Sequence, residues 1–120
     1  MRRLFVETSG FTAQLKKIEE GIRILSHIQK VIMENPEAGD VVQGTGGIRK
    51  IRVPDPSRGK GTRGGLRVMY LDLPNLEVTH LLVVFGKGEK EDISSSDKKE
   101  LKRLVDILKN MPLKSVRSKK

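Results

Sequence analysis

Apolar residues in the first third of the chain recur at the spacing of an α-helix. The steps between them are three and four residues, which places in one stripe Phe11, Leu15, Ile18, Ile22, Leu25, Ile28 and Ile32. Gly21 is expected to divide this stretch into two helices. The second helix should end at Asn35, because the ring of Pro36 disfavours a helical conformation in the residue before it. A short strand over Leu4–Glu7 precedes the helices, and residues 37–47 are expected to form a loop.

The middle of the chain has the pattern of β-strands. Strands are expected over Ile48–Val53, Leu66–Leu73 and Glu77–Phe85. The third of them is almost continuously apolar and is therefore expected to be central in a sheet. Pro74 and Asn75 mark the turn between the second and third strands.

The last predicted element is an amphipathic helix. Residues 94–97 supply capping side chains, and Pro112 ends the helix. Its apolar face consists of Leu101, Leu104, Val105 and Leu108. The element order predicts an α+β domain with helices on one side of a small twisted antiparallel or mixed sheet: two N-terminal helices and a C-terminal helix. We expect one domain over residues 1–112, followed by a basic, mobile tail over 113–120.

Composition narrows the classes of partner. Lys and Arg number 24 against 15 Asp and Glu, a formal net charge of +9, which favours nucleic acid or an anionic membrane over a neutral partner. The chain has no long apolar run and no signal-like amino terminus, so we expect a cytoplasmic protein that does not enter a membrane. It has no cysteine and two histidines, so neither a metal site nor a small-molecule cofactor is expected.

Positive charge is concentrated between residues 49 and 67, where Asp55 is the single acid. The seven cations of this segment are Arg49, Lys50, Arg52, Arg58, Lys60, Arg63 and Arg67. Strand alternation places Lys50 and Arg52 on one face of their strand, opposite its apolar residues. Arg67 joins that face if the two neighbouring strands pair as a hairpin. The segment therefore predicts a rigid basic surface for a polyanion.

Two groups of glycines accompany these cations. The first group, at positions 59, 61, 64 and 65, would let backbone amides approach a phosphate, with charge from Arg58, Lys60 and Arg63. The second group is the Gly-Thr-Gly-Gly block of residues 44–47, which opens a strand rather than a helix and does not predict nucleotide binding. As an alternative, the glycines only shape turns and the cations only keep the protein soluble.

Further candidate residues stand outside the basic segment. Lys87 and Lys90 directly follow the last strand, although Gly-Lys-Gly is also ordinary turn chemistry. Three acids lie beside them: Glu89, Glu91 and Asp92. They could offer a catalytic base or only offset the lysines. His27 and His80 could act as an acid and base pair if they converged, but a packed or exposed histidine is the simpler interpretation.

Three stretches of the sequence resemble a known family. They are GDVVQGTGGIRKIR at 39–52, RGGLRVMY at 63–70 and LLVVFGK at 81–87. Together they resemble the HigB-type branch of the RelE toxins from bacterial type II toxin-antitoxin systems, and the resemblance covers nearly the whole chain. It implies a RelE-like fold and a metal-independent endoribonuclease that enters the ribosomal A site, cleaves mRNA and so inhibits translation. It also implies a cognate antitoxin, usually a helix-turn-helix DNA-binding protein.

The resemblance assigns residues as well. The catalytic candidates are Lys50, Arg52, Arg67 and Lys87, and Arg67 matches the arginine that contacts the scissile phosphate. The cations expected to bind RNA are Arg49, Arg58, Lys60, Arg63 and Lys90. Gly88 and Ser94 stand where RelE has an arginine and a tyrosine near the nucleophilic hydroxyl, so the usual base candidate is missing. Tyr70 is expected on the strand face opposite Arg67.

Either another group accepts the proton of the attacking 2′-hydroxyl, or positioning on the ribosome carries more of the rate. Lys50 beside Arg52 and Arg67 is the best candidate, because neighbouring cations favour the neutral form of a lysine. The alternative to the toxin is a basic RNA- or DNA-binding module without catalysis. The scarcity of aromatic residues, 3% of the chain, weakens any claim to sequence-specific reading of single strands, which stacks bases on aromatic rings.

Overall fold

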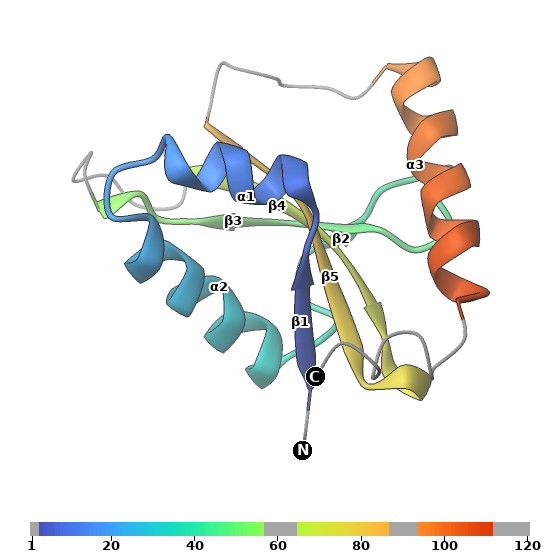
Figure 1. Cartoon of the computed structure of the whole chain (residues 1–120), viewed down its shortest axis with the longest axis horizontal. Coiled ribbons are helices and arrows are strands. Elements are labelled where there is room, and N and C mark those ends of the chain that lie inside the picture. Colours follow the sequence, from blue (N-terminus) through green and yellow to red (C-terminus); the bar gives the residue numbers. More distant parts are fainter. Residues whose placement is uncertain (1–2, 57–64, 87–93, 112–120) are drawn as a thin grey trace.

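Nine elements make up the described part of the computed structural model, which covers residues 3–56, 65–86 and 94–111 (Figure 1). In chain order they are β1 (Leu4–Glu7), α1 (Ser9–Lys16), α2 (Gly21–Glu34), β2 (Asp40–Val41), β3 (Arg49–Val53), β4 (Leu66–Leu73), the 3-10 turn η3 (Pro74–Leu76), β5 (Val78–Gly86) and α3 (Ser95–Lys109). The expected order of elements is confirmed. Only β2 was missed, because two residues are too few to show an alternating pattern.

One mixed five-stranded sheet forms the centre of the molecule, in the order β1-β5-β4-β3-β2. The pair β1 and β5 is parallel, and the other three pairs are antiparallel. The α+β class is therefore confirmed. The apolar strand β5 lies inside the sheet as expected, although the middle position belongs to β4.

The second helix buries the predicted apolar stripe with one exception, Ile22. The chain leaves the helical conformation after α1, and Glu20 adopts a left-handed conformation (φ 61°) before α2 begins at Gly21. Of the predicted residues in α2, Ile28 and Ile32 are buried and Leu25 is partly buried. Near the break, Ile24 is buried in place of Ile22, which is 88% exposed.

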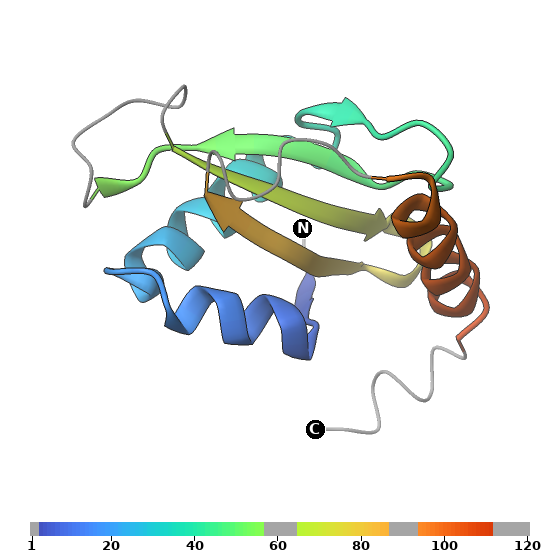
Figure 2. The same cartoon turned by 90° about the horizontal axis from the view of Figure 1, so that it is seen from above.

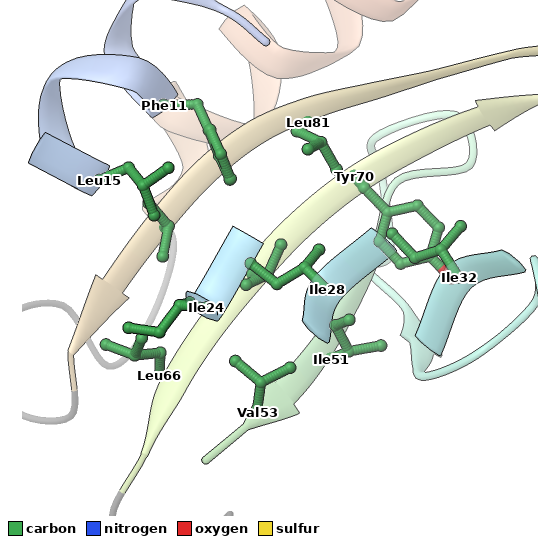
Figure 3. Close-up of a cluster of buried hydrophobic side chains, with 12 residues drawn as sticks. Phe11, Leu15, Ile24, Ile28, Ile32, Ile51, Val53, Leu66, Tyr70 and Leu81 are labelled. Carbon is green, nitrogen blue, oxygen red and sulfur yellow. The ribbon is translucent and has the colours of Figure 1, made fainter. Parts of the chain in front are cut away.

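Each face of the sheet has its own apolar cluster. Helices α1 and α2 cover one face, where Phe11 and the buried isoleucines of α2 meet Tyr70 of β4 and Leu81 of β5 (Figure 3). Helix α3 covers the opposite face, where Val105 and Leu108 belong to a second cluster; its members on the sheet include Met69, Leu71, Leu82 and Phe85. Figures 1 and 2 show α3 apart from the other two helices.

The expectation that all helices share one side of the sheet is thus wrong for α3. The reason is visible in β4, whose residues from Val68 to Leu71 are all buried, so that both faces of this strand are apolar. A sheet with two apolar faces needs a layer on each of them.

The Gly-Thr-Gly-Gly block forms a turn against α3. Thr45 is fully buried; its hydroxyl donates to the carbonyl of Val42 (2.7 Å) and accepts from the amide of Ile48 (3.2 Å). Gly46 has a φ of +84°, and its carbonyl accepts a hydrogen bond from Nζ of Lys109 (2.8 Å). A Cβ at Gly46 would lie 3.2 Å from Cγ1 of Val105. This block therefore helps to position α3.

Candidate functional site

Three cations share one face at one end of the β3–β4 hairpin. Arg52 is the direct cross-strand partner of Arg67, and Lys50 is the partner of Met69. Partners in an antiparallel pair point to the same side of the sheet. Ile51 points to the other side, where it is buried beneath α2. The predicted hairpin and alternation are confirmed, and we call Lys50, Arg52 and Arg67 the basic face.

The basic face is not neutralised by acids in the described part of the chain. The salt bridges there join Arg3 to Asp72, Arg23 to Glu20 and Lys102 to Asp106. Among the described residues, Arg67 donates to the carbonyl of its near neighbour Gly65 (3.2 Å), and Arg52 is exposed. Like charges placed directly opposite each other on two strands are destabilising. The positive charge of the basic face, which no acid of the described ranges pairs with, is suited to bind an anion.

Gly65 lets the two strands meet where the arginines stand. A Cβ on Gly65 would lie 2.1 Å from the carbonyl oxygen of Val53, a contact that no side chain could make. This glycine was expected in a phosphate-binding loop. Its contacts assign it instead to the close approach of β3 and β4, which fixes the register of Arg52 and Arg67.

Arg49 lies apart from the basic face. Its cross-strand partner is Tyr70, so its side chain points to the face that carries α1 and α2. There its guanidinium donates to the carbonyls of Glu37 (2.9 Å) and Gly39 (3.0 Å). These bonds attach the loop before β2 to the sheet. The role expected for Arg49 in RNA binding stays a prediction.

Tyr70 also faces away from Arg67, as its strand position predicted. Its ring is fully buried, and its hydroxyl donates to the carbonyls of Pro36 (3.0 Å) and Ala38 (2.7 Å). Burial raises the pKa of Tyr70 to about 12. A phenol that stays protonated on the far side of the sheet cannot accept a proton at the basic face.

Several predicted residues lie outside the described residues. They are Arg58, Lys60 and Arg63 in 57–64, and Lys87, Gly88, Glu89, Lys90, Glu91 and Asp92 in 87–93. Pro112 and the tail over 113–120 also lie outside them. Their expected roles therefore remain predictions. Ser94 is described: its hydroxyl accepts from the amide of Asp97 (3.1 Å) and caps α3.

The two histidines occupy different layers. His27 is exposed on α2, whereas His80 is buried in β5 and pairs with Leu71, on the face covered by α3. Burial lowers the pKa of His80 below its ordinary value of 6.5, because desolvation disfavours the charged imidazolium. The simpler interpretation, one exposed and one packed histidine, is thus confirmed.

Neither a metal-binding cluster nor a membrane-spanning helix is found in the described ranges. No group of three or more His, Asp or Glu side chains there could hold a metal ion. No helix there is long and apolar enough to cross a membrane.

A pocket of about 340 Å³ lies between α3 and the sheet face that carries the basic face. Its walls are Met69, Val83, Phe85, Leu101 and Leu104, with the carboxylates of Asp97 and Glu100. Sequence reasoning missed this pocket, because its walls come from three elements whose mutual placement no local pattern reveals.

The arrangement of elements is similar to that of known structures. A double arginine-to-alanine mutant of the E. coli toxin RelE in the free state matches with a TM-score of 0.58 and 18% identity, over 88% of this chain and 99% of that one. The isolated E. coli RelE toxin matches with a TM-score of 0.52 and 16% identity, over 85% and 98% of the two chains. No protein-family profile matches the chain. The chain therefore has the RelE-like toxin fold that its sequence predicted.

Proposed function

We propose that this chain is the toxin of a type II toxin-antitoxin system, of the HigB-like branch, and that it cleaves mRNA on the ribosome. One observation carries the proposal: Arg52 and Arg67 stand directly opposite each other, beside Lys50, on rigid paired strands. The RelE-like fold supports the same conclusion. Such a like-charge pair costs stability, and a bound anion would offset that cost.

The proposed reaction is attack by a ribose 2′-hydroxyl on the adjacent phosphorus. The new O2′–P bond forms as the P–O5′ bond breaks, the hydroxyl proton passes to an acceptor, and the leaving 5′-oxygen takes up a proton. Negative charge develops on the non-bridging oxygens, which Arg52 and Arg67 would stabilise. Donors that are already oriented at such a charge contribute roughly 3 to 4 kcal/mol each. The reaction needs no metal ion.

Lys50 is our candidate for the proton acceptor. Tyr70 is buried behind the sheet, and the hydroxyl of Ser94 is engaged in capping α3. Lys50 is half-buried, and its strand position places it on the same face as both arginines. Lys87 would complete the set of catalytic cations, with Arg58, Lys60, Arg63 and Lys90 gripping RNA around it.

The proposal also names partners. The ribosomal A site would hold the mRNA in the in-line geometry that the reaction needs, so that the toxin need not position the reacting atoms by itself. A cognate antitoxin, expected to be a helix-turn-helix DNA-binding protein, would keep the toxin inactive. The compartment is the cytoplasm, where ribosomes translate.

Cleavage can be tested with purified ribosomes, a defined mRNA and mapping of RNA 5′ ends. The protein should produce new ends only when ribosomes are translating the message. Arg67→Ala should lower the cleavage rate by roughly 100- to 1,000-fold, the usual loss for one such donor. Arg23→Ala is the matched control, because Arg23 is an exposed arginine on α2, its side chain 73% exposed.

Two outcomes would contradict the proposal. Full activity of Arg67→Ala would remove this residue from the reaction. The absence of new ends, together with RNA binding that weakens steeply with salt, would support the non-catalytic RNA- or DNA-binding module instead. Lys50→Ala tests the acceptor separately: it should abolish cleavage while leaving most of the RNA affinity.

A further inference from the structure

The pocket beneath α3 continues the surface that carries the basic face. Met69 on its wall is the cross-strand partner of Lys50, and Phe85 is the partner of Arg67. Partners lie about 5 Å apart between Cα atoms and point to the same side. A ligand whose anionic group binds the arginines can therefore place an attached group in the pocket.

The pocket walls suit a flat, largely apolar group. Met69, Phe85 and Val83 form its floor on the sheet, while Leu101 and Leu104 come from α3. Its volume of about 340 Å³ is at the small end of ligand pockets, which span roughly 300 to 1,000 Å³. Phe85 offers an aromatic surface, and single-stranded RNA is commonly bound by such surfaces next to cations.

A carboxylate stands on the rim of the same pocket. Glu100 is exposed and forms no salt bridge or hydrogen bond with another described residue. A carboxylate only accepts hydrogen bonds. It therefore fits a ligand that carries an N–H donor, and the exocyclic amino group of a nucleobase is such a donor.

We propose that this pocket is a nucleobase subsite, which takes the base next to the phosphate on the basic face, with Glu100 accepting a hydrogen bond from its exocyclic amino group. The inference rests on the proposed function for its choice of RNA as the ligand. Adenine, cytosine and guanine carry such a group, whereas uracil does not. The subsite would thus make this protein discriminate against uracil at one position of its RNA.

Nucleotide binding can be followed at the pocket itself by NMR of the full-length chain labelled with ¹³C in its methionine methyl groups. Met69 is 2% exposed and lines the pocket, so a bound base should shift its methyl signal through the ring current. Three probes separate the contributions: AMP, purine riboside 5′-monophosphate, which lacks only the amino group, and ribose 5-phosphate.

AMP should shift the Met69 signal in saturable fashion, and ribose 5-phosphate should leave it in place. Purine riboside monophosphate should bind roughly tenfold more weakly than AMP, because it loses one hydrogen bond to a charged acceptor. Glu100→Ala, which removes the acceptor, should remove most of that difference. Glu34→Ala, at an exposed position on α2, should preserve it. Leu101→Phe should weaken both purine nucleotides by filling the pocket.

Some results would overturn the subsite. AMP that binds without moving the Met69 signal, or ribose 5-phosphate that moves it equally, would place the ligand elsewhere. Equal loss of AMP and purine riboside monophosphate affinity in Glu100→Ala would refute the base-reading role. These measurements use no ribosomes. A protein that cleaves mRNA without these shifts would lose only the subsite, whereas shifts without cleavage would leave the subsite in place and remove the nuclease.

Discussion

Arg52→Gln is expected to stabilise the folded protein while it weakens RNA binding. Arg52 is exposed and lies directly opposite Arg67, so the substitution removes a like-charge pair and leaves the strand pairing intact. Two unit charges about 7 Å apart in water repel each other by roughly 0.6 kcal/mol. The free energy of unfolding should therefore rise by about that amount, which corresponds to roughly 3 °C in Tm for a domain of this size.

The assay is urea unfolding of the native protein, Arg52→Gln, Arg67→Gln and the double variant. If repulsion between the two guanidinium groups is the cause, the gains of the single variants should not add, because either substitution alone removes the same pair. The gain from Arg52→Gln should also fall towards zero in about 1 M salt, where the Debye length is only about 3 Å.

Three results would refute this reasoning. They are a loss of stability in Arg52→Gln, a gain that is unchanged at high salt, and additive effects of the two substitutions. The effect on RNA binding is measured separately. The affinity for single-stranded RNA should be lower in Arg52→Gln than in the native protein, and it should depend less steeply on salt concentration.

Three other predictions concern stability. The folded protein should lose stability as the pH falls below about 6.5, because burial lowers the pKa of His80 in the folded state and the unfolded chain takes up the proton first. In a His80→Leu variant, the free energy of unfolding in urea should depend less on pH between pH 5 and 7. Arg3→Met should cost roughly 3 to 5 kcal/mol, since it leaves the carboxylate of Asp72 buried without its ion pair, and adding Asp72→Asn should recover part of the loss in the same assay. Gly46→Ala should destabilise the protein by about 1 kcal/mol or more and speed amide hydrogen exchange in α3, because φ at this position is +84° and the new Cβ meets Val105. Gly10→Ala is the control and should have neither effect, since the atom nearest to its new Cβ is 3.9 Å away.

Strand parity explains why much of the candidate site could be predicted from sequence. Successive side chains on a strand alternate between faces, so the order Lys50-Ile51-Arg52 already separates cations from core. Pairing of the two strands as a hairpin then brings Arg67 to the same side. In this register Ile51 and Val68 both face the core, so the cations share the other face. Arg49 shows the limit of this reasoning, because the carbonyls of a preceding loop bind its guanidinium.

By itself the sequence determined the order of the elements, the extent of most helices and strands, and the residues that share a face. These properties follow from local backbone periods and from residues such as proline that end a helix. Only the tertiary structure decided that α3 covers the second face of the sheet, that a break before α2 exposes Ile22, and that α3 and the sheet enclose a pocket beside the basic face. Each of these depends on contacts between residues far apart in the chain, which no local pattern of apolar and polar residues contains.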